Sequence, residues 1–136
     1  MNNNCVCKVL VANKDNNQIL LIRRSLTDTR RPGQWDLPGG GQEDYETLED
    51  AAVREVQEEV GLTIVPNDLK LSYTISEPFN SASIELTHWL FFLCQVVNPQ
   101  IRLSFEHSKF LFTDLDSAIN LVEYSRHQRF LRAVKL

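Results

Sequence analysis

The chain has 136 residues, of which 43% are hydrophobic and 24% charged, a composition that builds a folded core and excludes an intrinsically disordered protein. Its 14 Lys and Arg against 18 Asp and Glu give a net charge of −4, which argues against a protein that binds nucleic acid polymers through a basic excess. Three cysteines without paired spacing exclude a disulfide framework, and the longest apolar run, residues 89–94, is too short to cross a bilayer.

The length and the cysteine content also indicate how the chain is organised and where it works. A length of 136 residues fits one domain covering residues 1–136. An odd number of cysteines is typical of a reducing compartment. The first residues show no basic segment followed by an apolar one, so we expect no signal peptide. We therefore expect a cytoplasmic protein that has no membrane partner.

The first third of the chain predicts a hairpin followed by a polar loop. Residues 6–12 and 18–23 are rich in β-branched and aliphatic side chains, which are typical of strands. Residues 13–17 between them are Asn, Lys and Asp, which suit a turn. A polar loop over 25–34 and a short extended segment over 35–37 follow, and a run of Pro and Gly ends the extended segment.

Residues 47–60 predict an amphipathic helix. At about 100° per residue, its apolar side contains Leu48, Ala52, Val53, Val56 and Val60. Glu55, Glu58 and Glu59 fall within an arc of roughly 100° beside that side. Gly61 stands where a left-handed C-terminal cap is expected. We expect one face of this helix to pack on a sheet and the adjacent face to present its carboxylates to a cleft.

The second half of the chain predicts further strands and two more helices. The expected strands are 69–75, 84–97 and 109–112, and the expected helices are 117–121, capped by Thr113 or Asp114, and 124–134. The order β, β, α, β, β, β, α indicates helices packed on a mixed sheet. We therefore expect an α/β fold with the layers of an α/β/α sandwich.

The three carboxylates of the first predicted helix indicate a metal site. Like charges at helical spacing repel each other, so crowding Glu55, Glu58 and Glu59 contributes nothing to packing. A divalent cation offsets this repulsion. Carboxylate oxygens are the ligands that hard divalent cations prefer, so a divalent cation is the simplest candidate for this site.

Residues 40–62 also match a longer pattern of fixed positions. The pattern is a glycine, five residues, Glu, seven residues, Arg-Glu, an aliphatic, any residue, Glu-Glu, any residue, Gly and an aliphatic. Its positions are occupied by Gly40, Glu46, Arg54, Glu55, Val56, Glu58, Glu59, Gly61 and Leu62. On this box the chain resembles the Nudix (MutT-like) hydrolases, and the preceding segment 33–40, GQWDLPGG, is similar to their usual approach to the box.

The resemblance implies both a fold and a reaction. The fold is the Nudix-type α/β/α sandwich with a mixed sheet and a catalytic loop-helix-loop. The reaction is metal-dependent hydrolysis of a phosphoanhydride in a nucleoside diphosphate linked to another moiety, such as a (deoxy)nucleoside triphosphate or a nucleotide sugar. The resemblance implies Mg²⁺ or Mn²⁺ as the cofactor, because such an ion neutralises the phosphate oxygens and acidifies a bound water. The partner is then a small nucleotide rather than a nucleic acid polymer, and a homodimer is compatible with the family.

The resemblance also assigns metal ligands. Glu55 and Glu59 are one turn apart and can ligate the same metal cluster, while Glu58 can complete the site or orient a water. The carbonyl of Gly39 is a further candidate ligand, as in related enzymes. Arg54 is expected to hold Glu55 or Glu46 in place through a charge-assisted hydrogen bond.

The catalytic and substrate-binding assignments reach beyond the carboxylates. Glu55, Glu58 and Arg54 are the expected catalytic residues, and Glu106 is an outside candidate for the general base or an additional ligand; its alternative is a plain surface residue. The expected substrate-binding residues are Arg23, Gly40, Glu46, Phe79 and His107. Arg23 would contact a phosphate, unless it is only an exposed strand end.

Two other functions remain open on the same fold. A non-catalytic nucleotide-binding or sensor module would bind a ligand without turnover. Diphosphate isomerisation would need a cysteine paired with a glutamate in the cleft, and nothing places Cys94 there. His127 lies on the last predicted helix, where we expect it at the surface.

Overall fold

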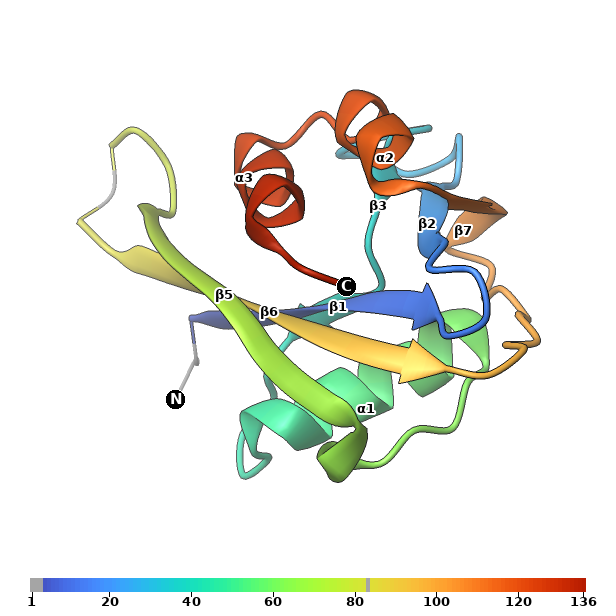
Figure 1. Cartoon of the computed structure of the whole chain (residues 1–136). Helices are drawn as coiled ribbons and strands as arrows, with labels where there is room; N and C mark the ends of the chain where they lie inside the picture. The colour runs from blue at the N-terminus through green and yellow to red at the C-terminus, as the bar shows by residue number, and fades with distance from the viewer. Residues whose placement is uncertain (1–3, 83) are drawn as a thin grey trace.

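A computed structural model of the chain describes residues 4–82 and 84–136 and shows a sheet with helices on both sides (Figure 1). The elements are β1 (Cys5–Asn13), β2 (Ile19–Arg24), β3 (Trp35–Asp36), β4 (Gly39–Gly41), α1 (Leu48–Val60), the 3₁₀ turn η1 (Pro66–Asp68), β5 (Leu69–Pro78), β6 (Leu86–Val96), β7 (His107–Thr113), α2 (Leu115–Leu121) and α3 (Ser125–Ala133). Within the described ranges, no helix is long and apolar enough to cross a membrane.

The seven strands named above form one sheet, which contains parallel and antiparallel pairs and is therefore mixed, as predicted. The main order is β3-β2-β1-β6-β5, with β4 paired to β1 and β7 paired to β2. The β1 and β6 strands run parallel, from the pair Cys5 and His88 to the pair Asn13 and Val96, whereas the other pairings are antiparallel. A parallel pair needs a long crossover, and α1 lies within the one that joins these two strands.

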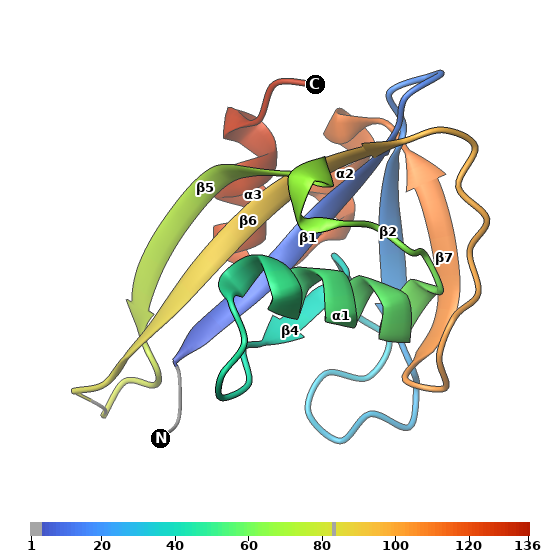
Figure 2. The same ribbon diagram turned by 90° about the horizontal axis from the view of Figure 1, so that it is seen from below.

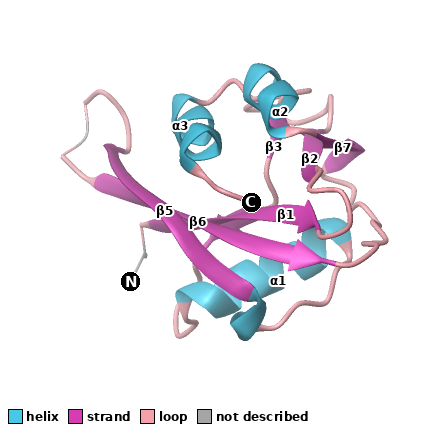
Figure 3. Cartoon of the chain, viewed as in Figure 1, coloured by secondary structure: helices cyan, strands magenta, loops and turns pink. Residues whose placement is uncertain are grey.

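The α/β/α layering follows from the alternation of side chains along the central strands. Cys7, Val9 and Val11 point to a core shared with α1, whereas Leu10 and Ala12 point to a second core under α2 and α3. Figures 2 and 3 show α1 on one face of the sheet and the two C-terminal helices on the other. The predicted fold class is therefore confirmed.

Helix α1 begins and ends as its sequence predicts. The Thr47 hydroxyl accepts a hydrogen bond from the N–H of Asp50 at 3.0 Å, which satisfies a free donor at the N-terminus. Gly61 ends the helix with φ of 75°, the left-handed conformation that favours glycine. The buried face differs in detail, because Ala51 is buried and Val53 only half-buried. Helix α1 thus turns its Glu59 inward.

Strand β4 and residue His127 depart from the sequence expectations. The glycines expected to form only a turn instead pair with β1, Gly40 opposite Cys7 and Gly39 opposite Lys8. A Cβ on Gly39 would lie 2.0 Å from the carbonyl oxygen of Cys7, so only glycine allows this pairing. The expectation that His127 lies at the surface is wrong, because its side chain is fully buried and contacts the rings of Phe91 and Tyr124.

Candidate active site

A cavity of about 590 Å³ opens between α1, the glycine strand β4 and the face of the sheet that carries α3. Six of the predicted site residues line it: Gly39, Gly40, Glu55, Glu59, Phe79 and Glu106. Other lining residues come from β1, β5, β6, the loop after β2 and α3. The cavity therefore joins segments that are far apart in the sequence.

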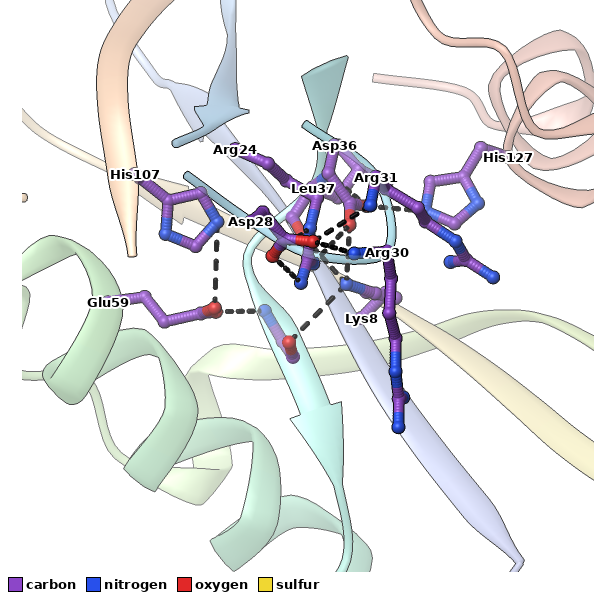
Figure 4. A network of polar contacts seen from close by, with 11 residues as sticks. Lys8, Arg24, Asp28, Arg30, Arg31, Asp36, Leu37, Glu59, His107 and His127 are labelled. Carbon is purple, nitrogen blue, oxygen red and sulfur yellow. Dashed lines mark hydrogen bonds and ion pairs between the residues drawn. The ribbon is translucent and has the colours of Figure 1, made fainter. Parts of the chain in front are cut away.

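Glu59 is the more buried of the two α1 carboxylates that line the cavity, with 7% of its surface exposed. Its Oε1 accepts a hydrogen bond from the backbone N–H of Gly39 at 2.7 Å (Figure 4). Burial raises the pKa of Glu59 to about 8, although Lys8 and the Gly39 N–H act in the opposite direction. Without a metal, Glu59 is therefore largely protonated near neutral pH, and a bound cation would displace that proton.

Glu55 lies one helical turn away, against the backbone of Gly40. A Cβ on Gly40 would come within 2.6 Å of Glu55 Oε1, so the glycine permits the close approach of the carboxylate. Burial raises the pKa of Glu55, and the neighbouring guanidinium of Arg54 partly offsets the effect. Glu55 and Glu59 thus face one end of the cavity together, beside the glycine backbone.

Arg54 holds this arrangement together. Its guanidinium donates to Glu46 through Nε at 3.0 Å and through Nη2 at 2.7 Å, a forked contact. Its Nη1 donates to Glu55 at 3.0 Å, and Nη2 also donates to the Gly41 carbonyl at 3.0 Å. The sequence left Glu46 and Glu55 as alternative partners, and the structure brings Arg54 to both.

Glu58 occupies a more open place than the other two helix carboxylates. Its side chain is 59% exposed and accepts from Arg54 Nη1 at 3.4 Å. It does not line the cavity. Glu58 is therefore exposed to solvent, unlike Glu55 and Glu59, which line the cavity.

A second group of metal-ligating side chains meets Glu59 from the segment that leads into β7. Ligand atoms of Glu59, Glu106 and His107 all lie within 4.8 Å of one another. Burial lowers the pKa of His107 to about 4, so the 3.8 Å contact between its Nε2 and Glu59 Oε2 joins two uncharged groups near neutral pH. The buried Nδ1 of His107 has no partner among the described residues.

These three side chains are suitable ligands for a divalent cation. Two carboxylates with a neutral imidazole are suitable ligands for Mn²⁺ and, through oxygen alone, for Mg²⁺. An added cation would restore the charge of Glu59 and relieve the cost of its burial. The Gly39 carbonyl, the other candidate ligand, accepts a hydrogen bond from Lys8 Nζ at 3.4 Å.

The expected substrate-binding residues are dispersed around this centre. Phe79, 70% exposed, lies on the cavity wall. The Arg23 side chain donates to the Gly33 carbonyl at 2.8 Å and does not line the cavity, whereas its neighbour Arg24 does. Arg24 is paired with Asp28 at 2.7 Å. The structure therefore brings Arg24, rather than Arg23, to the site.

Sequence reasoning missed a buried polar network beneath the cavity. Lys8 Nζ donates to Asp36 Oδ2 at 3.1 Å and to the Leu37 carbonyl at 3.2 Å, and His127 Nε2 lies 2.7 Å from Asp36 Oδ1 (Figure 4). Burial alone would raise the pKa of Asp36, but Lys8 and His127 hold it well below its usual range. The one available signal was a lysine within the apolar run of β1.

Comparison with known proteins finds a relative of similar sequence. The chain is 38% identical over 80 residues to the 8-oxo-dGTP diphosphatase of Escherichia coli K12, a match that spans 59% of this chain and 60% of that relative. The match thus covers somewhat less than two thirds of the relative's length.

Solved structures resemble the whole fold. The MutT protein from Methanosarcina mazei Go1 superposes with a TM-score of 0.78 at 27% identity, covering 94% of this chain and 89% of that one. The E. coli dihydroneopterin triphosphate pyrophosphohydrolase gives a TM-score of 0.78 at 22% identity, covering 96% and 94%, and supports the fold alone. The profile of the NUDIX domain matches residues 4–134, so this chain belongs to the NUDIX domain family.

Proposed function

We propose that the protein is a hydrolase that uses Mg²⁺ or Mn²⁺ to cleave a phosphoanhydride bond of a nucleoside diphosphate linked to another moiety. The observation that carries this proposal is the convergence of Glu55 and Glu59 on one cavity end, against the backbone of Gly39 and Gly40. Buried carboxylates of this kind are costly unless a cation satisfies them. The family membership supports the same reaction class.

The side chains have distinct roles in this proposal. Glu55 and Glu59 would hold the cation. Arg54 would fix the positions of the Glu55 and Glu46 side chains through its hydrogen bonds to both. When bound, the cation would neutralise the phosphate oxygens and lower the pKa of a water. Glu106 lies on the cavity wall close to Glu59 and is our candidate for accepting the proton of that water. Glu58 would orient the water or complete the ion's coordination from the solvent side.

The substrate we propose is a (deoxy)nucleoside triphosphate, cleaved to a monophosphate and pyrophosphate. The relative named above is an 8-oxo-dGTP diphosphatase, and M. mazei MutT shares the fold at 27% identity. Arg24 and Arg30 line the cavity and supply positive charge for a polyphosphate. We further propose that residues 1–136 act as one domain in the cytoplasm, on a small nucleotide rather than a polymer, and that a homodimer is compatible with this role.

The test is release of pyrophosphate or phosphate from a nucleotide panel with Mg²⁺ or Mn²⁺. We expect Glu59→Gln to lower kcat by about 100-fold or more, because the amide keeps the hydrogen bond from Gly39 but offers no charge to a cation. Glu49→Gln, an exposed change on the same helix, is the matched control and should leave kcat unchanged.

The competing function is a sensor module that binds nucleotides without hydrolysing them. Wild-type protein that binds several nucleotides with a divalent ion, yet releases no phosphate from any of them, would replace our proposal with that one. Isomerisation chemistry finds no support, since Cys94 is buried in the core against α1.

A further inference from the structure

The end of the cavity far from Glu55 and Glu59 is lined by a different set of side chains. Glu77 of β5, Thr87 and Trp89 of β6 and Arg126 of α3 line it, with Phe79 beside them. None of these residues takes part in the proposed metal chemistry. A cation, a carboxylate and aromatic rings gathered in one concave place are typical of a site that orients an organic ligand.

The sheet sets the distance between the two ends. Gly41 of β4 pairs with Val6 of β1, Val6 pairs with Trp89 of β6, and the neighbouring Thr87 pairs with Glu77 of β5. Three strand spacings therefore separate the glycine strand from Glu77, roughly 14 Å in the direction of the hydrogen bonds. A nucleotide whose phosphates lie at Glu55 and Glu59 would extend along the cavity and place its base near this far end.

Arg126 lies there against two aromatic rings, and two of its nitrogen donors have no partner among the described residues. Its Cζ lies 3.6 Å from the centre of the Trp89 ring and 4.6 Å from that of Tyr124. Its Nη1 donates to Glu77 Oε1 at 3.5 Å, a long hydrogen bond. Its Nε and Nη2 are buried, and no described residue accepts a hydrogen bond from them. Burial lowers the pKa of Arg126, and the negative charge of Glu77 is the main opposing influence. Additional hydrogen-bond acceptors would therefore stabilise this guanidinium.

Glu77 provides the complementary acceptors beside these donors. Its side chain is partly exposed, and its carboxylate faces Arg126 as its ion-pair partner. A ligand edge that presents an acceptor next to two N–H donors would satisfy both residues at once. Guanine has this edge: O6 accepts, and N1–H and the N2 amine donate to the two oxygens of one carboxylate. The other bases present fewer adjacent donors to a carboxylate.

We propose that Arg126 and Glu77 are the specificity-determining pair of the site and select a guanine base. The inference rests on the proposed function for the position of the phosphates, and it adds the identity of the base. Arg126 donates to O6 and Glu77 accepts from N1–H and the N2 amine, while Phe79 offers a ring face at the rim. Both residues orient the substrate and take no part in bond cleavage.

The test is calorimetric titration with GMP, AMP, CMP and UMP in EDTA, where no phosphoanhydride is present and hydrolysis plays no part. We expect wild-type protein to bind GMP about tenfold or more tightly than AMP. Glu77→Gln should remove that preference, because an amide offers one acceptor in place of two. The matched control is Glu123→Gln, an exposed residue near α3 that does not line the cavity and should keep the preference.

A second variant addresses the guanidinium. Arg126→Lys keeps the charge but loses the planar fork, so GMP binding should fall toward that of AMP. Arg129→Lys on the exposed side of α3 should behave as wild type. Thermal unfolding checks that each variant is folded, and Glu77→Gln decides the question if Arg126→Lys is not.

The outcomes separate this inference from the proposed function. Equal affinity of the wild type for the four nucleotides, no binding of any of them, or a preference retained in Glu77→Gln would each overturn the role of the pair. A preference for GMP that is lost in Glu77→Gln would support it even in a protein that hydrolyses no nucleotide. In that case only the hydrolase proposal would fail.

Discussion

Glu59 shows how a single residue links burial to metal binding. Its carboxyl lies under the Gly39 N–H and beside His107, almost out of contact with water. The folded protein therefore holds a proton on Glu59 far more strongly than the unfolded chain does, with a pKa of about 8 against an ordinary value of 4.5.

This shift predicts the pH dependence of stability without a metal. A folded pKa above the unfolded one means that the stabilising contribution is fully present below about pH 4.5 and is lost as the pH rises toward 8. We would measure the melting temperatures of the wild type and of Glu59→Gln in EDTA. The wild-type value minus the variant value should fall between pH 5 and pH 8. Adding Mn²⁺ at pH 8 should reverse the fall. A difference between the two proteins that does not depend on pH would contradict the assignment.

At the scale of elements, β4 decides the geometry of the carboxylate end. This strand consists of three glycines, and each has different surroundings. Gly39 has φ of 139°, and a Cβ added to it would meet the backbone of β1. A Cβ on Gly40 would meet the Glu55 carboxylate, whereas one on Gly41 would meet nothing within 4 Å. The strand thus lets the backbone of β1 and a side chain of α1 approach from opposite directions.

Three alanine substitutions in β4 should give three different results. Gly39→Ala should unfold or strongly destabilise the protein, by about 2 kcal/mol or more, because its Cβ would overlap the Cys7 carbonyl. Gly40→Ala should displace Glu55 and weaken Mn²⁺ binding about tenfold or more, with a smaller effect on stability. Gly41→Ala is the control and should change neither. Urea unfolding and Mn²⁺ titration measure the two effects, and equal behaviour of all three variants would disprove this account of β4.

At the scale of the whole molecule, the Lys8–Asp36–His127 network joins three elements. Lys8 comes from β1, Asp36 from β3 and His127 from α3, so the network connects the central strand, a short neighbouring strand and the outer helix layer. Lys8 also donates to the carbonyls of Leu37 and Gly39. The network therefore supports the backbone that leads into the candidate site.

Breaking this network should destabilise the fold as a whole. Asp36→Asn leaves the buried Lys8 ammonium without a charged partner, a change that costs about 3–5 kcal/mol in comparable buried pairs. Asp15→Asn, in the exposed turn after β1, is the control and should stay within about 0.5 kcal/mol of wild type. The free energy of unfolding in urea at pH 7 measures both, and similar values for the two variants would contradict a structural role for Asp36.

Much of the fold and part of the site could be predicted from local patterns. The hairpin, helix α1 with its caps and the mixed sheet follow from periodicity and turn residues, which act over a few positions. Strand β4 and the burial of His127 could not be predicted in this way. A glycine run has no strand propensity of its own, and His127 is buried only because Phe91 and Asp36 contact it from other elements.

The sequence by itself determined the family box, its carboxylates and the class of reaction that such a box favours, because those depend on residue types at fixed spacing within one helix and its flanks. Only the tertiary structure decided which carboxylates are buried, that Arg24 rather than Arg23 reaches the cavity, and that Glu77 and Arg126 meet across two elements. Burial and pairing of this kind depend on contacts between residues far apart in the chain. Local spacing carries no information about such contacts.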